Sequence, residues 1–289
     1  MTPVAGPVTV RAMRSVRALS LGVLLLTVGC AHKKPPPPAP PPPPPPPAGD
    51  TLKLLPKSGD EPKGKVKLVI EQDAQGPKGK PQHLGLSFEL TDEEKIDSVS
   101  ADGTATVTAR IADAVGQVLS GASQPMVDDF ALALDELKIS LKRSSRGEVV
   151  AVVMSGLRPP LEEGTARVML NAIYSAQRGA ILPERPIDVN GTWKVDTALP
   201  PSSGFTGLVS YTYTYARKGG GVAVITCAGI IDGKGGTKKM TGKSSGEYRL
   251  EMETGRIIGS VVEADTTVEQ TAANAAPVKQ HVRAEWTLQ

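Results

Sequence analysis

The sequence has 289 residues, of which 33 are Lys or Arg and 30 are Asp or Glu. Three arginines, Arg11, Arg14 and Arg17, lie in an N-terminal segment that we expect to be removed, which leaves 30 basic and 30 acidic residues. A net charge near zero argues against nucleic acid as a partner, because such proteins carry a surplus of clustered Lys and Arg.

Residues 1–29 have the layout of a secretory signal peptide. The three arginines precede an apolar run over 19–28, and the segment contains no acidic residue. This run is about half of the roughly 20 apolar residues that a membrane-spanning helix needs. We therefore expect a cleaved signal, with translation starting either at Met1 or at Met13.

The five residues at the end of this segment, Leu26-Thr27-Val28-Gly29-Cys30, resemble the bacterial lipobox. The lipobox pattern prefers leucine three positions before the cysteine, where this chain has Thr27. The resemblance implies cleavage before Cys30 and lipidation of its thiol; the alternative is a buried free cysteine behind an uncleaved segment. Several acyl chains give stable anchoring, so the membrane is one expected partner. By the enterobacterial sorting rule, Ala31 implies the outer membrane, facing the periplasm or the cell surface.

Every residue from Pro35 to Pro47 except Ala39 is proline. Such a run adopts an extended polyproline helix, here a stiff rod of roughly 40 Å at about 3.1 Å per residue. The alternative is a ligand for an aromatic recognition groove. We interpret residues 30–50 as a lipidated N-terminus with its spacer, and 51–289 as a single β-rich domain.

The domain is predicted to be mainly β, because ten segments show the alternation of apolar and polar residues that is typical of half-buried strands. These segments are 66–68, 84–90, 105–111, 137–141, 149–154, 209–215, 222–227, 248–252, 257–268 and 282–288. The links between them are short, which favours antiparallel pairing. We expect a large curved antiparallel sheet or half-barrel.

One helix is predicted over 161–176, where Met169, Leu170 and Ile173 recur on one face. Prolines precede this segment and a glycine follows it, as is usual at helix boundaries. We expect the helix to pack on the concave face of the sheet. Residues 126–134 fit both a strand and a helix, and we favour a short helix.

The segment 103–109 resembles 221–227, and each is followed by a predicted hairpin. Gly147 and Gly255 fall at turn positions that need positive φ. We interpret this echo as two similar meander halves; the alternative is chance similarity between ordinary strands. The halves would be residues 51–156 and 187–289.

The segment Leu182-Pro183-Glu184-Arg185-Pro186-Ile187-Asp188-Val189-Asn190-Gly191-Thr192-Trp193, between two sets of strands, resembles a family of envelope lipoproteins of unknown function. More distantly, the layout is similar to the lipoprotein-carrier half-barrels of the LolA, LolB and LppX types. That second resemblance implies a concave face that holds acyl chains. A shared fold does not by itself imply a shared function.

Few residues suggest catalysis. His32, His83 and His281 do not have the spacing of metal ligands, so we expect neither a metal nor another cofactor. Cys227, on a predicted strand, is interpreted as core packing, with a nucleophile as the alternative.

Ser244 lies in a formal G-x-S-x-G match, and Asp265 and His281 follow it in hydrolase order. That motif requires a strand before the serine and a helix after it, whereas here a lysine-rich loop precedes and a strand follows. We therefore interpret the segment as a solvated hairpin tip and the protein as not an enzyme.

Two further groups are candidate contact residues. The cluster of Lys234, Lys238, Lys239 and Lys243 could meet anionic lipid or glycan, or could simply aid solubility. The other group could face an apolar ligand, with ordinary packing as the alternative for its tyrosines. Its members are Met169, Leu170, Ile173, Tyr211, Tyr213 and Tyr215.

Two functions remain open at this point. The first is an anchored envelope lipoprotein without enzymatic activity whose β-rich domain binds a partner or an apolar or lipid ligand. The second is a structural or assembly component of an envelope protein complex, with no ligand cavity. An apolar cavity in the concave face would favour the first, and a filled core with an exposed apolar patch would favour the second.

Overall fold

The computed structural model describes residues 49–76, 79–135, 137–157, 159, 180–199, 203–270 and 276–289. The chain divides into two compact units, Met1–Pro45 and Pro46–Gln289, and all the described residues belong to the second. Within the described residues, no helix has both the length and the apolar character needed to cross a membrane.

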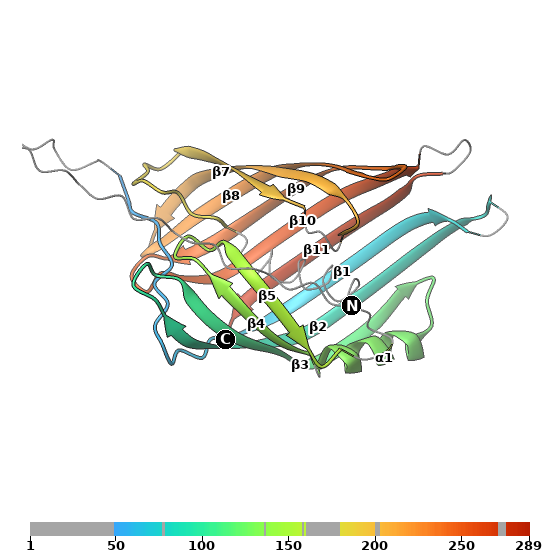
Figure 1. The fold of residues 1–289 in the computed structure, drawn as a ribbon, viewed down its shortest axis with the longest axis horizontal. Coiled ribbons are helices and arrows are strands. Elements are labelled where there is room, and N and C mark those ends of the chain that lie inside the picture. The colour runs from blue at the N-terminus through green and yellow to red at the C-terminus, as the bar shows by residue number, and fades with distance from the viewer. Residues whose placement is uncertain are drawn as a thin grey trace, which may run out of the picture. The chain divides into compact units, whose positions relative to one another are not determined.

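Eleven antiparallel strands in the described chain form one sheet, in the order β5-β4-β3-β2-β1-β11-β10-β9-β8-β7-β6 (Figure 1). The strands are β1 Lys63–Gln75, β2 Pro81–Val99, β3 Ala105–Ser120, β4 Lys138–Arg143, β5 Val149–Ser155, β6 Thr192–Ala198, β7 Thr206–Gly219, β8 Val222–Gly235, β9 Lys238–Glu251, β10 Arg256–Gln270 and β11 Val278–Leu288. One helix, α1, covers Gln124–Asp135. The first and last strands of the domain, β1 and β11, pair with each other in the middle of the sheet. The N-terminal and C-terminal strands of the domain therefore lie side by side.

The sheet has one apolar face and one polar face because side chains alternate along each strand. In β1, Val66 and Leu68 are buried while Lys65 and Lys67 are exposed. The register then places Trp286 beside Val66 and Ala284 beside Leu68 on the same buried side. We call the side that carries Val66 and Leu68 the inner face and the opposite side the outer face.

The sheet is strongly curved, since one short segment bonds near both of its edges. The Leu182 amide donates to the Arg146 carbonyl in the β4–β5 turn at 2.8 Å. One residue earlier, the Ile181 carbonyl accepts from the indole of Trp193, in edge strand β6, at 2.7 Å. The prediction of a large curved antiparallel sheet is thereby confirmed.

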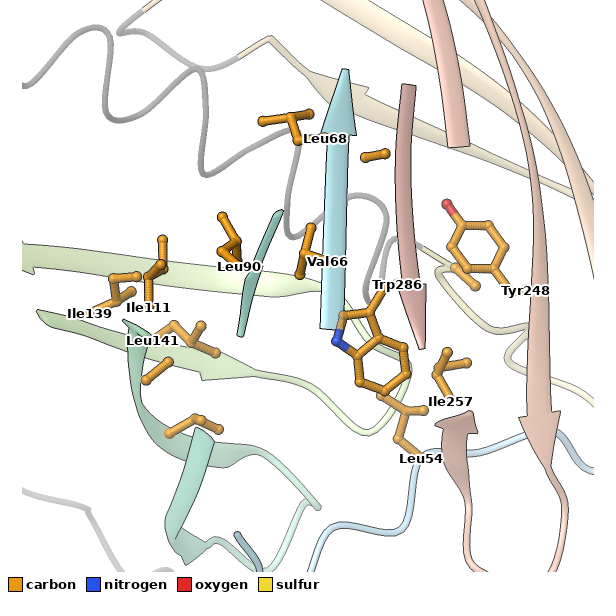
Figure 2. Close-up of a cluster of buried hydrophobic side chains, with 14 of the residues drawn as sticks. Leu54, Val66, Leu68, Leu90, Ile111, Ile139, Leu141, Tyr248, Ile257 and Trp286 are labelled. Atoms are coloured by element: carbon orange, nitrogen blue, oxygen red, sulfur yellow. The ribbon is translucent and has the colours of Figure 1, made fainter. Parts of the chain in front are cut away.

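The hydrophobic core lies on the inner face, at the end of the sheet where β1 begins and β11 ends. Figure 2 shows side chains from different strands of the sheet meeting there, among them Leu68, Ile139 and Trp286. Its members include Val66, Leu68, Leu90, Ile111, Ile139, Leu141, Tyr248, Ile257 and Trp286, each at most 6 % exposed. Leu54, which precedes the first strand, packs against them.

Residues 50–62, here called the strap, cross this end of the sheet. The Leu54 amide donates to Ser145 in the β4–β5 turn at 2.9 Å, and the Leu55 amide donates to Gly255 in the β9–β10 turn at 3.3 Å. Gly255 has φ of 63°, and a Cβ there would lie 2.5 Å from the Leu55 nitrogen. Only glycine suits both the turn and the approach of the strap. We call this end of the sheet the capped end and the opposite one the far end.

The strap begins with an ionic anchor on β7. The Asp50 carboxylate accepts from Tyr215 Oη at 2.9 Å and from Lys218 Nζ at 2.7 Å. The hydrogen bond from Lys218, helped by that from Tyr215, lowers the pKa of Asp50. Burial, together with the neighbouring Asp50 charge, raises the pKa of Tyr215 to about 12. The chain is therefore fixed at the first residues that follow the proline-rich segment.

A buried ion pair lies inside the capped end. Arg143 Nη2 donates to Glu94 Oε2 at 3.0 Å, and both side chains are at most 4 % exposed. Glu94 and neighbouring Asp92 occupy inner-face positions on β2. The alternation of apolar and polar residues along a strand leads us to expect apolar residues on the inner face. The sequence patterns therefore did not predict a charged pair there.

Helix α1 covers one corner of the inner face. A Cβ on Gly116 of β3 would lie 2.3 Å from Val127 Cγ1 and 3.0 Å from Phe88, so the glycine makes room for the helix. The ambiguous segment 126–134 is therefore helical, as favoured. The longer helix expected over 161–176 lies outside the described residues.

The strand predictions are confirmed for all ten segments, but most strands are longer than expected. β1 continues to Gln75, past the end of its apolar alternation. The eleventh strand, β6, starts at Thr192 and was not predicted as a strand. The interpretation of Ser244 as part of a hairpin tip is wrong: the turn lies at 236–237, and β9 begins at Lys238. The glycines that precede Ser244 hid this strand.

The two turn glycines have the predicted conformation, with φ of 95° at Gly147 and 63° at Gly255. The two echoed segments lie at the starts of β3 and β8. The groups that begin with these strands, β3-β4-β5 and β8-β9-β10, also occur in the same spatial order across the sheet. An eleventh strand and the insertion of α1 make the halves unequal. The pseudo-repeat itself stays a prediction.

Candidate functional site

A single line of side chains crosses the inner face from β3 to β6 in register. Its members are Val118, Leu86, Ile70, Val282, Ala264, Ser244, Gly229, Tyr211 and Val195. We call this line the inner row. All of its members except Ser244 are apolar or aromatic, and seven of the nine are only partly buried. Nine strands thus contribute to one continuous, largely apolar band.

On the central strands β1 and β11, the inner row marks the place where full burial ends. Two residues nearer the capped end, Leu68 is 0 % exposed and Ala284 is 3 % exposed. On the same strands, Ile70 and Val282 are half-buried. Beyond the row, Gln72 and Gln280 lie opposite each other on the inner face. Apolar side chains that lie next to the buried core but remain partly exposed are typical of ligand sites.

The three tyrosines of β7 lie on the inner face, as their spacing predicts. Tyr213 and Tyr215 are fully buried, whereas Tyr211, in the inner row, is half-buried. Tyr213 stacks on Trp193 with ring centroids 5.4 Å apart, and it lies 5.6 Å from Tyr211. Packing therefore accounts for two of the tyrosines, and Tyr211 keeps the position of a ligand-facing residue.

Cys227 lies in the core beside these aromatic rings. Burial raises the pKa of its thiol to about 11, although a hydrogen bond from Tyr248 acts in the opposite direction. Burial likewise raises the pKa of Tyr211 and of Tyr213. Because a nucleophilic cysteine needs a substantial thiolate fraction, this thiol is suited to packing.

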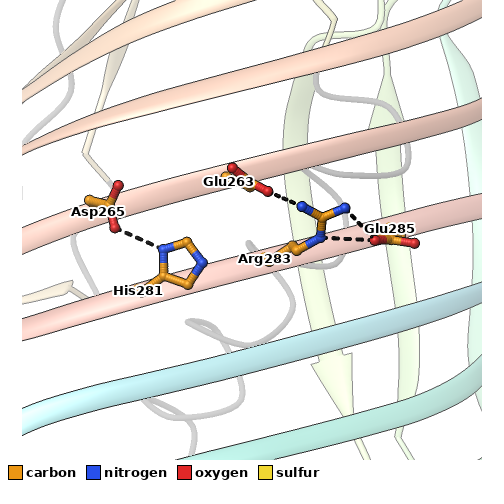
Figure 3. Close-up of polar contacts among 5 residues, drawn as sticks. All are labelled: Glu263, Asp265, His281, Arg283 and Glu285. Atoms are coloured by element: carbon orange, nitrogen blue, oxygen red, sulfur yellow. Dashed lines mark hydrogen bonds and ion pairs between the residues drawn. The ribbon is translucent and has the colours of Figure 1, made fainter.

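The structure separates the residues of the formal hydrolase motif. Ser244 lies on the inner face opposite Ala264, whereas Asp265 and His281 lie on the outer face. Figure 3 shows His281 Nδ1 paired with Asp265, at 2.8 Å, among outer-face charges that include Arg283. The hydrogen bond from Arg283 to Glu285 raises the pKa of the arginine. The sheet lies between the serine and the other two residues, so these three cannot act as a catalytic triad.

Lys234, Lys238 and Lys239 flank the β8–β9 turn at the far end, whereas Lys243 lies further along β9. Lys234 lies directly opposite Lys239, and Lys243 lies opposite Ile230. The outer-face register also places acids next to them, with Glu269 beside Lys239 and Asp265 beside Lys243. Strand alternation thus puts Lys238 on the inner face and the other three lysines on the outer face, where these acids offset part of their charge.

A small cavity lies at the capped end, between the strap and the sheet. It has a volume of about 50 Å³, and Leu54, Arg143, Arg256 and Trp286 are among its lining residues. Ligand pockets usually measure about 300–1,000 Å³. This cavity is therefore too small for an acyl chain.

Of the other predicted site residues, Met169, Leu170 and Ile173 lie outside the described residues, as does Cys30. Among the described residues, no three His, Cys, Asp or Glu side chains are grouped so that they could hold a metal ion. Sequence reasoning found Tyr211 but missed the rest of the inner row. Its members alternate correctly within each strand, and only the cross-strand register reveals that they form one line.

Comparison with known proteins indicates the fold alone. No protein family and no curated protein matches the sequence. A solved structure of lipovitellin, titled for its lipid–protein interactions, is similar in fold, with a TM-score of 0.52 and 13% sequence identity. The match covers 81% of this chain and 25% of that one, so it spans about a quarter of the lipovitellin chain. The chain thus has the architecture of a large β-sheet found in lipovitellin.

Proposed function

We propose that this chain is an envelope lipoprotein without enzymatic activity, anchored through lipid on Cys30, whose inner face binds an apolar ligand such as the acyl chains of a lipid. The anchoring part rests on the N-terminal sequence, in which a short apolar run ends at Gly29-Cys30. The residue after the lipobox cysteine, Ala31, supports a location at the outer membrane, facing the periplasm or the cell surface.

The ligand-binding part rests on the inner row. Its seven apolar or aromatic side chains come from seven strands, and all of them remain partly accessible. Leaving a Val, Leu or Ile side chain in water forgoes about 1.5–3 kcal/mol relative to full burial, so an apolar ligand would gain by covering the row. The lipovitellin structure, which is described in terms of lipid–protein interactions, has a similar fold over about a quarter of its chain, and this likeness supports the proposal.

The anchor is tested by Cys30→Ser in the full chain expressed in a bacterial host. We expect wild-type protein to fractionate with membranes and to carry a diacylglyceryl mass on its N-terminal peptide. The variant should lose both the added mass and the membrane association. Unmodified wild-type protein that retains residues 1–29 would contradict the anchoring part only.

Ligand binding is tested with a photoreactive fatty acid incorporated into membrane phospholipid in cells that produce the full chain. Cross-linked peptides should contain inner-row residues. Ile70→Glu should reduce labelling at least fivefold, because it places a charge in the middle of the row. The matched control is Val69→Glu, one residue away on the same strand, whose side chain points to the outer face opposite Arg283.

Equal labelling of wild-type protein, Ile70→Glu and Val69→Glu would show that the acyl chains contact the chain unspecifically. In that case the ligand-binding part fails even if Cys30 is lipidated. The assembly function would then become the better account of the domain.

A further inference from the structure

We propose that Asn190 is a site of N-linked glycosylation, which places an oligosaccharide on the surface of the domain beside the start of the strap. Asn190, Gly191 and Thr192 form an Asn-X-Thr sequence, here called the acceptor sequence, in which X is any residue except proline. The inference rests on export of the chain, which is part of the proposed function, and does not depend on ligand binding at the inner row.

The acceptor sequence lies in a tight turn that leads into edge strand β6. The Gly191 amide donates to the Asp188 carbonyl at 2.8 Å and closes this turn. The Asn190 amide donates to the Tyr215 carbonyl at 2.7 Å, and the Tyr215 amide donates to the Gly191 carbonyl at 3.0 Å. These hydrogen bonds hold the backbone of the acceptor sequence against β7.

The turn lies on the surface of the folded domain. Asp188, Val189, Asn190 and Thr192 are all exposed, and Gly191 is half-buried. A glycan is bulky and hydrophilic, so its asparagine must remain at the surface after folding. The acceptor sequence meets this requirement.

The side chains of the acceptor sequence do not hold the turn together. Within the described part of the chain, neither the Asn190 carboxamide nor the Thr192 hydroxyl takes part in a hydrogen bond. The β2–β3 turn differs in this respect, because Asp102 accepts there from Ser100 Oγ at 2.6 Å and from the Thr104 amide at 3.0 Å. The two groups that define the acceptor sequence are therefore not used to stabilise the turn.

The geometry of the turn accounts for its backbone but not for these two groups. Asn190 has φ of 70°, a conformation that asparagine tolerates and glycine adopts more easily. A Cβ on Gly191 would lie 2.4 Å from Ile187 Cγ1 and 2.8 Å from the Asp188 carbonyl oxygen, so packing requires glycine there. Neither requirement selects a carboxamide at Asn190 or a hydroxyl at Thr192.

The reaction that fits this site is the transfer of an oligosaccharide from a polyprenyl diphosphate carrier by an envelope oligosaccharyltransferase. A bond forms between Asn190 Nδ2 and the anomeric carbon of the first sugar, while the bond between that carbon and the diphosphate of the carrier breaks. Nδ2 gives one proton to a base of the transferase, and polyprenyl diphosphate leaves. The Thr192 hydroxyl serves in recognition of the acceptor sequence.

The position of Asn190 gives the glycan a place next to the N-terminal end of the domain. Ile187, three residues earlier, pairs with Asp50 at the start of the strap. Tyr215, whose carbonyl accepts from the Asn190 amide, also donates through its hydroxyl to the Asp50 carboxylate. A glycan on Asn190 would therefore shield the junction between the proline-rich segment and the domain.

The test is mass spectrometry of the full chain purified from the envelope of its native cells. Wild-type peptides that contain Asn190 should carry the mass of an oligosaccharide and release sugar fragment ions. Asn190→Gly should lose this mass and keep the turn, because glycine suits a positive φ. Thr192→Val should lose it as well, whereas Thr192→Ser should keep it, since serine retains the hydroxyl.

The valine and serine variants are a matched pair. Valine keeps the β-branched shape of the residue that lies opposite Thr214, and circular dichroism should show wild-type β-sheet content in both variants. The lipid on Cys30, measured in the same samples, reports export. Lipidated wild-type protein without sugar on Asn190 would overturn this proposal and leave the proposed function intact. Equal modification of wild-type protein and Thr192→Val would also overturn it. Wild-type protein that carries neither lipid nor sugar would overturn this proposal together with the anchoring part of the proposed function.

Discussion

The capped end and the far end of the inner face are built from the same strands but differ in burial. At the capped end, the strap, the β4–β5 turn and the β9–β10 turn enclose Trp286, Leu68 and their neighbours. On β1 and β11, apolar residues from the inner row onward stay partly accessible, whereas Val209 of β7 and Ile231 of β8 are buried beyond the row. Stability is therefore concentrated at one end of the sheet, which leaves apolar surface further along available for binding.

The largest loss in the free energy of unfolding should come from breaking the buried ion pair at the capped end. Arg143→Ala leaves the Glu94 carboxylate buried without its guanidinium partner, and removing one member of such a pair costs about 3–5 kcal/mol. We expect a loss of this size in the free energy of unfolding, measured with urea. Arg283→Ala is the control. Arg283 pairs with two glutamates but is 41% exposed, and exposed pairs contribute about 0–1 kcal/mol. If both variants lost the same free energy of unfolding, water would have to reach the Arg143–Glu94 pair, because the pair would then contribute no more than an exposed one.

Two alanine substitutions on β1 compare the ends directly. Leu68→Ala should destabilise the domain by about 2–5 kcal/mol, because Leu68 is fully buried. Ile70→Ala, two residues along the same face, should cost roughly half as much or less, since part of that side chain is already accessible. Thermal and urea unfolding of both variants would measure the difference. If Ile70→Ala were as costly as Leu68→Ala, the inner row would belong to the core.

The smallest expected effect is at the start of the strap. Asp50→Asn should cost about 1–2 kcal/mol at neutral pH, because it weakens charged hydrogen bonds from Lys218 and Tyr215. The pKa of Asp50 is lowered in the folded state, so its contribution is present above the unfolded pKa near 3.8. This contribution is lost as the pH falls through the lowered value. In Asp50→Asn, the corresponding part of the acid dependence should disappear.

The partner Tyr215 has the opposite pH dependence. Its pKa is raised from 10.0 to about 12 in the folded state, so its contribution is complete below pH 10 and is lost as the pH rises towards 12. Tyr215→Phe should remove this alkaline loss of stability while leaving the ring in place. An unchanged alkaline unfolding profile in that variant would contradict the raised pKa.

Part of the fold and of the candidate site was predictable from local patterns. Alternation at Val66 and Leu68 identified a strand and its buried face, and the spacing of the three β7 tyrosines put them on one face. β6 escaped because its seven residues contain a single tryptophan and one valine among polar residues. The Arg143–Glu94 pair escaped because its members lie 49 positions apart, and no local pattern pairs two distant charges.

Local sequence patterns were enough to specify the mainly β character of the domain, the apolar face of most strands, and the glycines that allow its turns. These properties depend on residues close in the chain, where backbone geometry and alternation act directly. The tertiary structure was needed to show that the strap closes one end of the sheet, that α1 protects the exposed part of β3, and that residues from nine strands align as the inner row. Those features depend on register and curvature, which arise from contacts between residues far apart in the chain.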